Sequence, residues 1–155
     1  MTHTISLDPI ANVKNMRNDM SDDFWGNVLS EITLVDELPE ESLQGIETFS
    51  HLEIIYHFNK ADAAKVVLNA AHPRENKTWP KVGIFAQRKK DRPNHIGTTI
   101  VKLVARKGKT LIVSNLDADD GTPVLDIKPV VKEFLPQGEV VQPTWISELM
   151  KNYWK

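Results

Sequence analysis

Two segments of this 155-residue chain concentrate side chains that can bind charged ligands. Residues 83–97 read GIFAQRKKDRPNHIG, an apolar run that leads directly into a cationic loop. Arg88 and Arg92 offer planar guanidinium groups that suit phosphate or carboxylate, and Lys89 and Lys90 add point charges. The pattern is typical either of an anion-binding loop or of an ordinary charged loop between two strands.

The second segment, residues 116–129, reads LDADDGTPVLDIKP and carries four carboxylates. An EF-hand calcium loop needs glycine at its sixth position and glutamate at its twelfth. Counted from Asp117, those positions hold threonine and lysine, so no calcium loop is predicted. The D-G-T-P sequence instead favours a tight turn. Such a turn suits a cationic or amine-bearing ligand held against Asp117 or Asp120, and turn capping is the structural alternative for both.

Composition excludes several kinds of chemistry. The chain has no cysteine, which excludes disulfides, thiolate nucleophiles, cysteine zinc sites and protein-ligated iron–sulfur clusters. Its seven glycines are too widely spaced for a G-x-G-x-x-G fingerprint or a Walker loop. No apolar run approaches the ~18 residues of a membrane-spanning helix. The first residues lack the apolar core of a signal peptide, so we expect a cytoplasmic protein.

Charge is strongly segregated along the chain. Residues 21–53 contain nine acids and no lysine or arginine, whereas residues 81–109 contain nine bases and one acid. The two stretches either attract each other within the fold, or the basic one receives a phosphate backbone. A pI near 6.2 argues against indiscriminate coating of nucleic acid.

Short runs of β-branched and aromatic residues, separated by turn signals, predict a mainly β protein. Regular alternation of strands and helices is absent, which argues against a doubly wound parallel sheet. A hairpin turn is predicted at residues 106–109, a short helical turn at 39–43 and a C-terminal helix at 143–154. The predicted strands are residues 28–35, 51–58, 81–87, 98–105 and 110–115.

Together, the two charged segments resemble the signatures of the TsaA-like, or TrmO, family of S-adenosylmethionine-dependent methyltransferases. Those signatures read G-[IV]-F-A-x-R-S-P-x-R-P-N-P-I-G and L-D-x-x-D-G-T-P-V-L-D-I-K-P. GIETFSHL at residues 45–52 is similar to the family's G-[LI]-E-G-F-S-H-L, and HPR at 72–74 to its H-P-R element. The resemblance implies one domain over residues 1–155. It would contain a closed or nearly closed β-barrel over about 9–136, short helical segments and a C-terminal helical extension over about 143–155.

The resemblance further implies S-adenosylmethionine as cofactor, a homodimer without metal or membrane, and N6-methylation of threonylcarbamoyladenosine at tRNA position 37. The catalytic candidates are Asp117 and Asp120, with His95 as a weaker base. By motif position, the cofactor site would comprise Phe85, Ala86, Arg88, Thr98, Asp117, Asp120, Gly121, Thr122 and Pro123, with Asn59 and Lys60 in place of a frequent His-Lys pair. The substrate or RNA contacts would be Arg74, Lys89, Lys90, Arg92 and Asn94.

The chain also departs from the family pattern. Lys89 and Lys90 replace a Ser-Pro pair, and His95 replaces a proline. The N-terminal G-x-P-R-Q stretch is absent, residues 22–27 read DDFWGN, and the additional C-terminal domain of longer members has no counterpart. Two alternatives therefore stay open: a methyltransferase acting on another, small substrate, and a non-catalytic S-adenosylmethionine-binding module.

Overall fold

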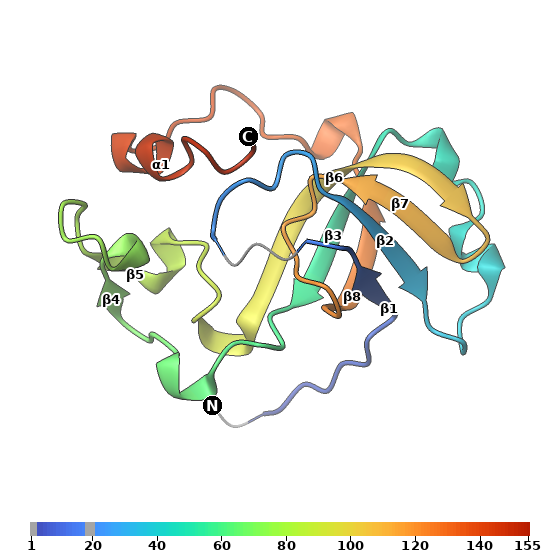
Figure 1. Cartoon of the computed structure of the whole chain (residues 1–155), viewed down its shortest axis with the longest axis horizontal. Helices are drawn as coiled ribbons and strands as arrows, with labels where there is room; N and C mark the ends of the chain where they lie inside the picture. The colour runs from blue at the N-terminus through green and yellow to red at the C-terminus, as the bar shows by residue number, and fades with distance from the viewer. Residues whose placement is uncertain (1–2, 18–20) are drawn as a thin grey trace.

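The computed structural model describes residues 3–17 and 21–155, and its centre is a closed antiparallel β-barrel (Figure 1). Around the barrel the strands follow the order β1–β2–β7–β6–β3–β8. Their bounds are β1 (Ala11–Lys14), β2 (Leu29–Leu34), β3 (His51–His57), β6 (Ile96–Lys107), β7 (Thr110–Ser114) and β8 (Pro123–Pro129). The predicted mainly β barrel is confirmed.

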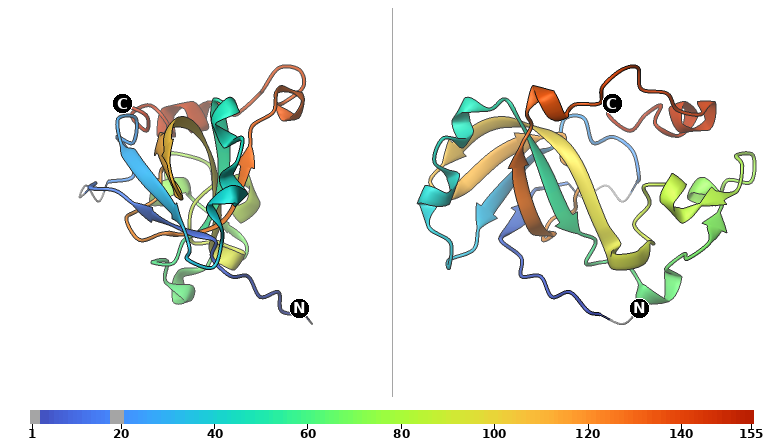
Figure 2. Two further views of the ribbon diagram at one scale, coloured as in Figure 1. Left: turned by 90° about the vertical axis from the view of Figure 1, so that its right-hand side faces the viewer. Right: turned by 180° about the vertical axis from the view of Figure 1, so that it is seen from behind.

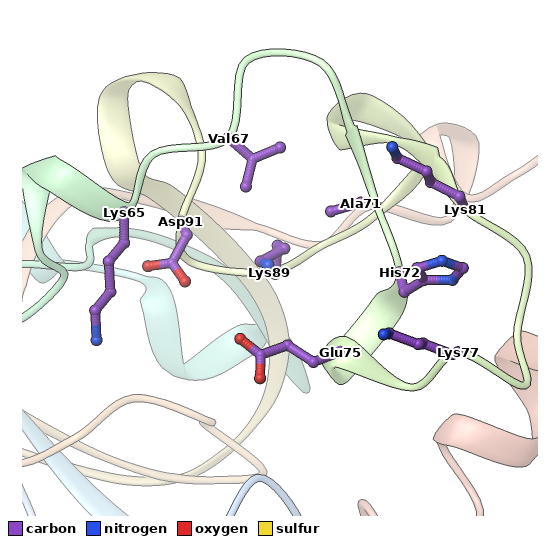
Figure 3. Close-up of a pocket in the computed structure, with 9 residues that line it drawn as sticks. All are labelled: Lys65, Val67, Ala71, His72, Glu75, Lys77, Lys81, Lys89 and Asp91. Carbon is purple, nitrogen blue, oxygen red and sulfur yellow. The ribbon is translucent and has the colours of Figure 1, made fainter.

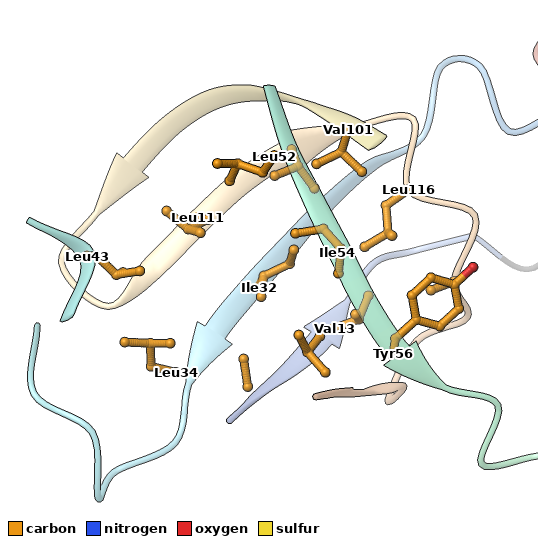
Figure 4. Close-up of a cluster of buried hydrophobic side chains, with 14 residues drawn as sticks. Val13, Ile32, Leu34, Leu43, Leu52, Ile54, Tyr56, Val101, Leu111 and Leu116 are labelled. Atoms are coloured by element: carbon orange, nitrogen blue, oxygen red, sulfur yellow. The ribbon is translucent and has the colours of Figure 1, made fainter. Parts of the chain in front are cut away.

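Alternating side chains along these strands fill the barrel. In β2, Ser30, Ile32 and Leu34 are buried while the residues between them are exposed, which is the period of two expected for a half-buried strand. Ile32, Leu52, Ile54, Val101, Leu111 and Val113 have no measurable exposure. Figure 4 shows these side chains converging, with Tyr56 at one edge of the cluster and its hydroxyl directed away from it.

One end of the barrel is closed by short local structures. The β6–β7 hairpin turns at Gly108, whose φ of 59° is a conformation that glycine adopts without strain. Beside it run η1 (Glu40–Leu43) and η2 (Ile46–Thr48). Arg106 forms ion pairs with Glu40 at 3.1 Å and Glu47 at 2.6 Å. The predicted hairpin and helical turn are confirmed, and here the acidic and basic stretches do attract each other.

The other end of the barrel, called here the open end, lies where β3 ends and where β6 and β8 begin. Tyr56, near the end of β3, pairs with Gly97 near the start of β6 and with Val124 near the start of β8. Ala11 of β1 pairs with the same Val124, which closes the barrel. Because all neighbouring strands are antiparallel, the loops that carry both charged segments emerge at this end.

A long excursion from residue 58 to residue 95 leaves the open end between β3 and β6 (Figure 2). Its elements are η3 (Ala63–Lys65), β4 (Ala70–Ala71), η4 (Pro73–Glu75), β5 (Val82–Gly83), η5 (Ile84–Ala86) and η6 (Pro93–His95). The buried strand predicted at residues 81–87 is wrong. Only Val82 and Gly83 pair, because β4 offers only two residues, and the chain then turns so that Phe85 is 77% exposed.

The C-terminal segment packs back against the open end. After η7 (Lys132–Phe134), the helix α1 spans Thr144–Leu149 and is shorter than the sequence predicts. Beyond it the chain pairs with an N-terminal loop: the N–H groups of Phe24 and Trp25 donate to the carbonyls of Asn152 (3.1 Å) and Tyr153 (2.7 Å). No helix within residues 3–17 and 21–155 has the length and apolar character needed to span a bilayer.

Candidate active site

The carboxylate of Asp117 is the centre of a hydroxyl cluster at the open end. Tyr56 donates to its Oδ1 at 3.1 Å, and Thr99 donates a short hydrogen bond to the same atom. On the other side, the hydroxyl of Tyr153 donates to Oδ2. The three donors come from β3, β6 and the C-terminal segment, so this one carboxylate connects the barrel to the end of the chain.

Burial keeps both tyrosines of this cluster protonated. Removal from water is the main cause that raises the pKa of Tyr56 and of Tyr153 well above the usual range, and the negative charge of Asp117 raises both further. The two hydroxyls therefore act as donors at neutral pH. A carboxylate that accepts three hydrogen bonds from three different elements is held in a fixed orientation.

The tight turn that the sequence predicts follows Asp117, and the structure fixes it against β1, where the N–H of Gly121 donates to the carbonyl of Val13 at 2.8 Å. Gly121 has a φ of 85°, and the hydroxyl of Thr122 donates to the carbonyl of Asp119 at 2.7 Å. The side chain of Asp120 accepts from the main-chain N–H of Asn15 at 3.0 Å. Asp120 is exposed, and this single contact leaves one of its carboxylate oxygens open to solvent.

The cationic loop and the aspartate turn meet on one strand, β6. Arg88 donates from Nη2 to the carbonyl of Thr98 at 2.6 Å, and the next residue, Thr99, bonds Asp117. Thr98 also donates its hydroxyl to Glu53 at 3.0 Å. Arg88 bonds the main chain of Thr98 and Asp117 bonds the side chain of Thr99, so both segments lie against the open-end start of β6.

The other arginines named from the sequence are engaged within the protein. Arg92 donates to the carbonyl of Gln87 at 2.6 Å, and its guanidinium lies 5.9 Å from the ring of Phe85. Arg74 forms an ion pair with Asp23 at 3.0 Å, across to the N-terminal loop. Both therefore stabilise the loops around the site, and each keeps guanidinium N–H groups that have no protein partner in these contacts.

The remaining candidates lie on exposed loops of the same end. Asn59 and Lys60 follow β3 directly, and the carbonyl of His95 accepts from the neighbouring Phe58 N–H at 2.8 Å. The ring of His95 bonds the carbonyl of Lys90 at 3.1 Å. The others, also on or beside this end, are Ala86, Lys89, Asn94 and Pro123, of which Asn94 has a φ of 66°.

The sequence-based candidates omit three residues that the structure places on Asp117: Tyr56, Thr99 and Tyr153. The alternation of β3 could have marked Tyr56 as inward-facing. Tyr153 lies 36 residues from Asp117 and no local pattern marks it.

The tryptophans around the C-terminal segment pack within the protein. Trp25 is 6% exposed, and Trp79 donates to Glu148 of α1 at 2.7 Å. The Trp79 and Trp145 rings lie 6.5 Å apart. Within the described residues, no group of three or more histidine, aspartate or glutamate side chains is arranged to hold a metal ion.

A sequence model of the tRNA-methyltransferase O N-terminal domain matches residues 21–134. The chain belongs to this family. Because the match covers both charged segments, it confirms the resemblance drawn from their motifs. The N-terminal loop that contacts Tyr153 also falls within the matched residues.

Two relatives and a solved structure show how far the similarity extends. A probable S-adenosyl-L-methionine-binding protein of Pyrococcus abyssi is 42% identical over 78% of this chain and 62% of its own length. The tRNA (adenine(37)-N6)-methyltransferase of Homo sapiens is 39% identical over 74% of this chain and 25% of its own. A crystal structure of TrmO from Pseudomonas aeruginosa superposes with a TM-score of 0.69 at 27% identity, covering 90% of this chain and 62% of that one. The chain thus spans at most about three-fifths of these relatives.

Proposed function

We propose that this protein transfers a methyl group from S-adenosylmethionine to N6 of an adenosine in tRNA, with threonylcarbamoyladenosine at position 37 as the preferred acceptor. One observation carries the proposal: Arg88 and Asp117, which come from different motifs and lie 29 residues apart in the sequence, bond to the adjacent residues Thr98 and Thr99. Family membership supports the same activity. The cytoplasm, where mature tRNA is used, is the compartment that this activity implies.

The residues at the open end fit S-adenosylmethionine by their chemistry. The cofactor carries a carboxylate, two positive centres and an adenine ring, and it supplies an activated methyl group when bound. Arg88 uses one N–H on Thr98 and has further donors for a carboxylate. Asp117 and Asp120 offer negative charge to the positive centres, and Phe85 exposes an aromatic face on which an adenine can stack.

The two carboxylates would have different tasks in methyl transfer. Asp117, which accepts from three hydroxyls, would hold the side chains of Tyr56 and Tyr153 in place beside the bound ligands. Asp120 has one main-chain contact and a solvent-facing oxygen, so its carboxylate is the freer one to accept the proton that the attacking nitrogen loses. Holding the acceptor in line with the methyl group contributes ~7–11 kcal/mol to such reactions, more than a proton acceptor does.

We also propose a homodimer formed through the outer face of β6. Ile96, Ile100 and Val104 recur every four residues on that face and are 39%, 49% and 53% exposed. Beside them lies a cavity of about 360 Å³ lined in part by Ile100 and Leu135. Exposed apolar side chains gathered on one face mark association sites. Light scattering should give twice the chain mass for the wild type and the chain mass for Ile100→Glu.

The activity is tested with purified protein, S-adenosylmethionine and tRNA that carries threonylcarbamoyladenosine, followed by mass spectrometry of the nucleosides. We expect a gain of one methyl group on the modified adenosine. Asp117→Asn and Arg88→Met should reduce the rate by at least about tenfold, in line with lost positioning or acid–base groups. Asp119→Asn, an exposed neighbour in the same turn, and Lys107→Met, at the far hairpin, are the matched controls and should retain activity.

Calorimetry with S-adenosylmethionine separates this proposal from the two alternatives. Binding without methylation of any tRNA or nucleoside would indicate a binding module. Methylation of a free nucleoside but not of tRNA would indicate a small substrate. Absence of binding would contradict all three interpretations.

A further inference from the structure

The excursion between β3 and β6 contains a cavity that no motif of the sequence identified. Its volume is about 590 Å³, within the range of small-molecule and nucleotide sites. The lining comes from three chain stretches, around Lys65, around His72 and around Lys89. Figure 3 shows Lys65 and Asp91 on one side, Lys77 and Lys81 on the other, and Lys89 and Glu75 between them.

Most of the charge around this cavity is positive and unpaired. Four lysines line it, and within residues 3–17 and 21–155 none of them forms an ion pair with a protein carboxylate: Lys65, Lys77, Lys81 and Lys89. This differs from the far end of the barrel, where Arg106 has two acidic partners. Like charges gathered around one hollow repel one another and attract an anion. A phosphate or carboxylate would relieve that repulsion.

A buried hydrogen-bond acceptor adds a second requirement for a ligand of this cavity. Oδ1 of Asp91 is buried, and no donor within the described residues reaches it. The main-chain carbonyl of Asp91 accepts from Val67 at 2.9 Å, which fixes this residue at the cavity wall. A buried acceptor without a partner is unfavourable. Asp91 also lines the cavity, so its carboxylate can accept from a hydrogen-bond donor that a ligand carries close to its anionic group.

The walls of this cavity are held together by hydrogen bonds. The buried side chain of Gln87 donates to the carbonyls of Ala71 at 2.9 Å and Val82 at 3.0 Å, joining β4 to β5. The ring of His72 donates to the carbonyl of Trp79 at 2.8 Å. The cavity is thus built by fixed contacts between its walls, so a ligand meets a preformed site.

We propose that this cavity binds a ribose-phosphate unit of an RNA strand, with the lysines on the phosphate and Asp91 accepting from the ribose 2′-hydroxyl. The 2′-hydroxyl is the donor next to phosphate that RNA has and DNA lacks. Lys89 follows Arg88 directly, so a strand held here would lead toward the cluster around Asp117. The inference rests on the proposed function and specifies how its RNA substrate is held.

The test measures fluorescence anisotropy of a labelled anticodon stem-loop RNA and of DNA with the same sequence, over a range of salt concentrations. Lys65→Gln/Lys77→Gln should weaken binding of both by at least about fivefold. It should also reduce the slope of log K against log salt by about 0.7, because one phosphate contact contributes about 0.7 in single strands. Lys102→Gln/Lys107→Gln, two lysines of the basic stretch on the barrel, is the control and should bind like the wild type.

Asp91 is tested separately by its effect on the preference for RNA. Asp91→Ala should lower RNA affinity toward that of DNA without weakening DNA binding. Asp91→Asn, which keeps one acceptor oxygen, should retain part of the preference and serves if the alanine variant does not fold. Equal losses for RNA and DNA in both Asp91 variants would overturn the role of the 2′-hydroxyl.

Failure of this inference can be distinguished from failure of the proposed function. If wild-type protein methylates tRNA and the double lysine variant binds RNA normally, the cavity proposal is wrong and the function stands. If no methylation occurs but the lysine variant loses RNA binding, the cavity proposal stands. Calorimetry should show unchanged S-adenosylmethionine binding for the lysine variant, and a loss there would overturn its assignment to RNA.

Discussion

The two ends of the barrel use their charges in opposite ways. At the far end, Arg106 lies between Glu40 and Glu47, and Lys109 donates to main-chain carbonyls of residues 35 and 36. At the open end, the four lysines that line the cavity form no ion pair within the described residues, and the carboxylate of Asp117 bonds neutral hydroxyls. Charges matched within the protein stabilise it, whereas charges left unmatched are available to ligands.

Backbone conformation also differs between the two ends of the barrel. Within the described residues, six non-glycine residues have a positive φ: Phe24, Arg74, Glu75, Asn94, His95 and Asn115. All six belong to the N-terminal loop, the excursion or the segment between β7 and β8, and all of these meet the open end. Such conformations are unfavourable for residues with a Cβ and persist where surrounding contacts impose them. The concentration of strain agrees with a site at this end.

The largest effect is expected from packing at the start of β6. A Cβ on Gly97 would lie 2.7 Å from ring atoms of Tyr56 and Phe58, and Tyr56 is held by its bond to Asp117. We expect Gly97→Ala to lower the free energy of unfolding by about 1–3 kcal/mol, the usual loss on overpacking. Gly83→Ala is the matched control, because its Cβ would meet nothing closer than 4.0 Å and its φ of −60° suits alanine.

Urea denaturation of both variants measures this difference. Equal stability of the two variants would show that the Tyr56 ring is free to move. The difference between the two ends of the barrel would then not hold, because the hydroxyl cluster would not be rigidly built into the barrel.

How far the sequence predicts the molecule also differs between the two ends. The strands around the β6–β7 hairpin follow local rules, so alternation and one glycine suffice to place them. β1 has only four residues and β8 carries a proline at each end, so neither stands out, although their pairing closes the barrel. The motifs give Arg88 and Asp117, but Tyr153 reaches Asp117 through tertiary packing that no window of sequence contains.

A smaller loss of stability is expected when the C-terminal segment loses its hydrogen bond to Asp117. Tyr153→Phe removes one of the three donors to Asp117, and hydrogen bonds to charged groups contribute about 1.5–3 kcal/mol. Because two donors remain, we expect a loss near the lower limit, about 1.5 kcal/mol at neutral pH. Phenylalanine keeps the ring, so packing against the open end is preserved. Urea denaturation at pH 7 measures the loss.

The free energy of unfolding at alkaline pH gives a second test of the hydrogen bonds from the tyrosines to Asp117. Folding raises the pKa of Tyr56 and Tyr153, so above about pH 10 the unfolded chain releases protons that the folded protein still holds. The free energy of unfolding should therefore be insensitive to these groups below pH 10 and fall as the pH rises above it. Tyr153→Phe should make this fall shallower. A spectroscopic titration in which both tyrosines of the folded wild type ionise near pH 10 would contradict the cluster.

The smallest effect is expected at the far end, where the charges are matched but partly exposed. Arg106→Met removes the ion pairs with Glu40 and Glu47, whose side chains are 59% and 50% exposed. Water and salt screen such pairs, so we expect a loss of stability smaller than that of Tyr153→Phe, and one that shrinks as salt is added. Lys107→Met, which removes a neighbouring charge from the same hairpin, is the control and should leave stability unchanged.

The free energy of unfolding at acid pH tests whether the ion pairs of Arg106 stabilise the far end. Hydrogen bonds from its own main-chain N–H and from Arg106 lower the pKa of Glu47 below its usual 4.5. The stabilisation is then present above pH 4.5 and is lost as the pH falls further, because the unfolded chain takes up the proton first. Arg106→Met should flatten that acid loss while RNA binding at the other end stays unchanged. If RNA binding also weakened, the far end would belong to the ligand surface, and the division between matched and unmatched charge would fail.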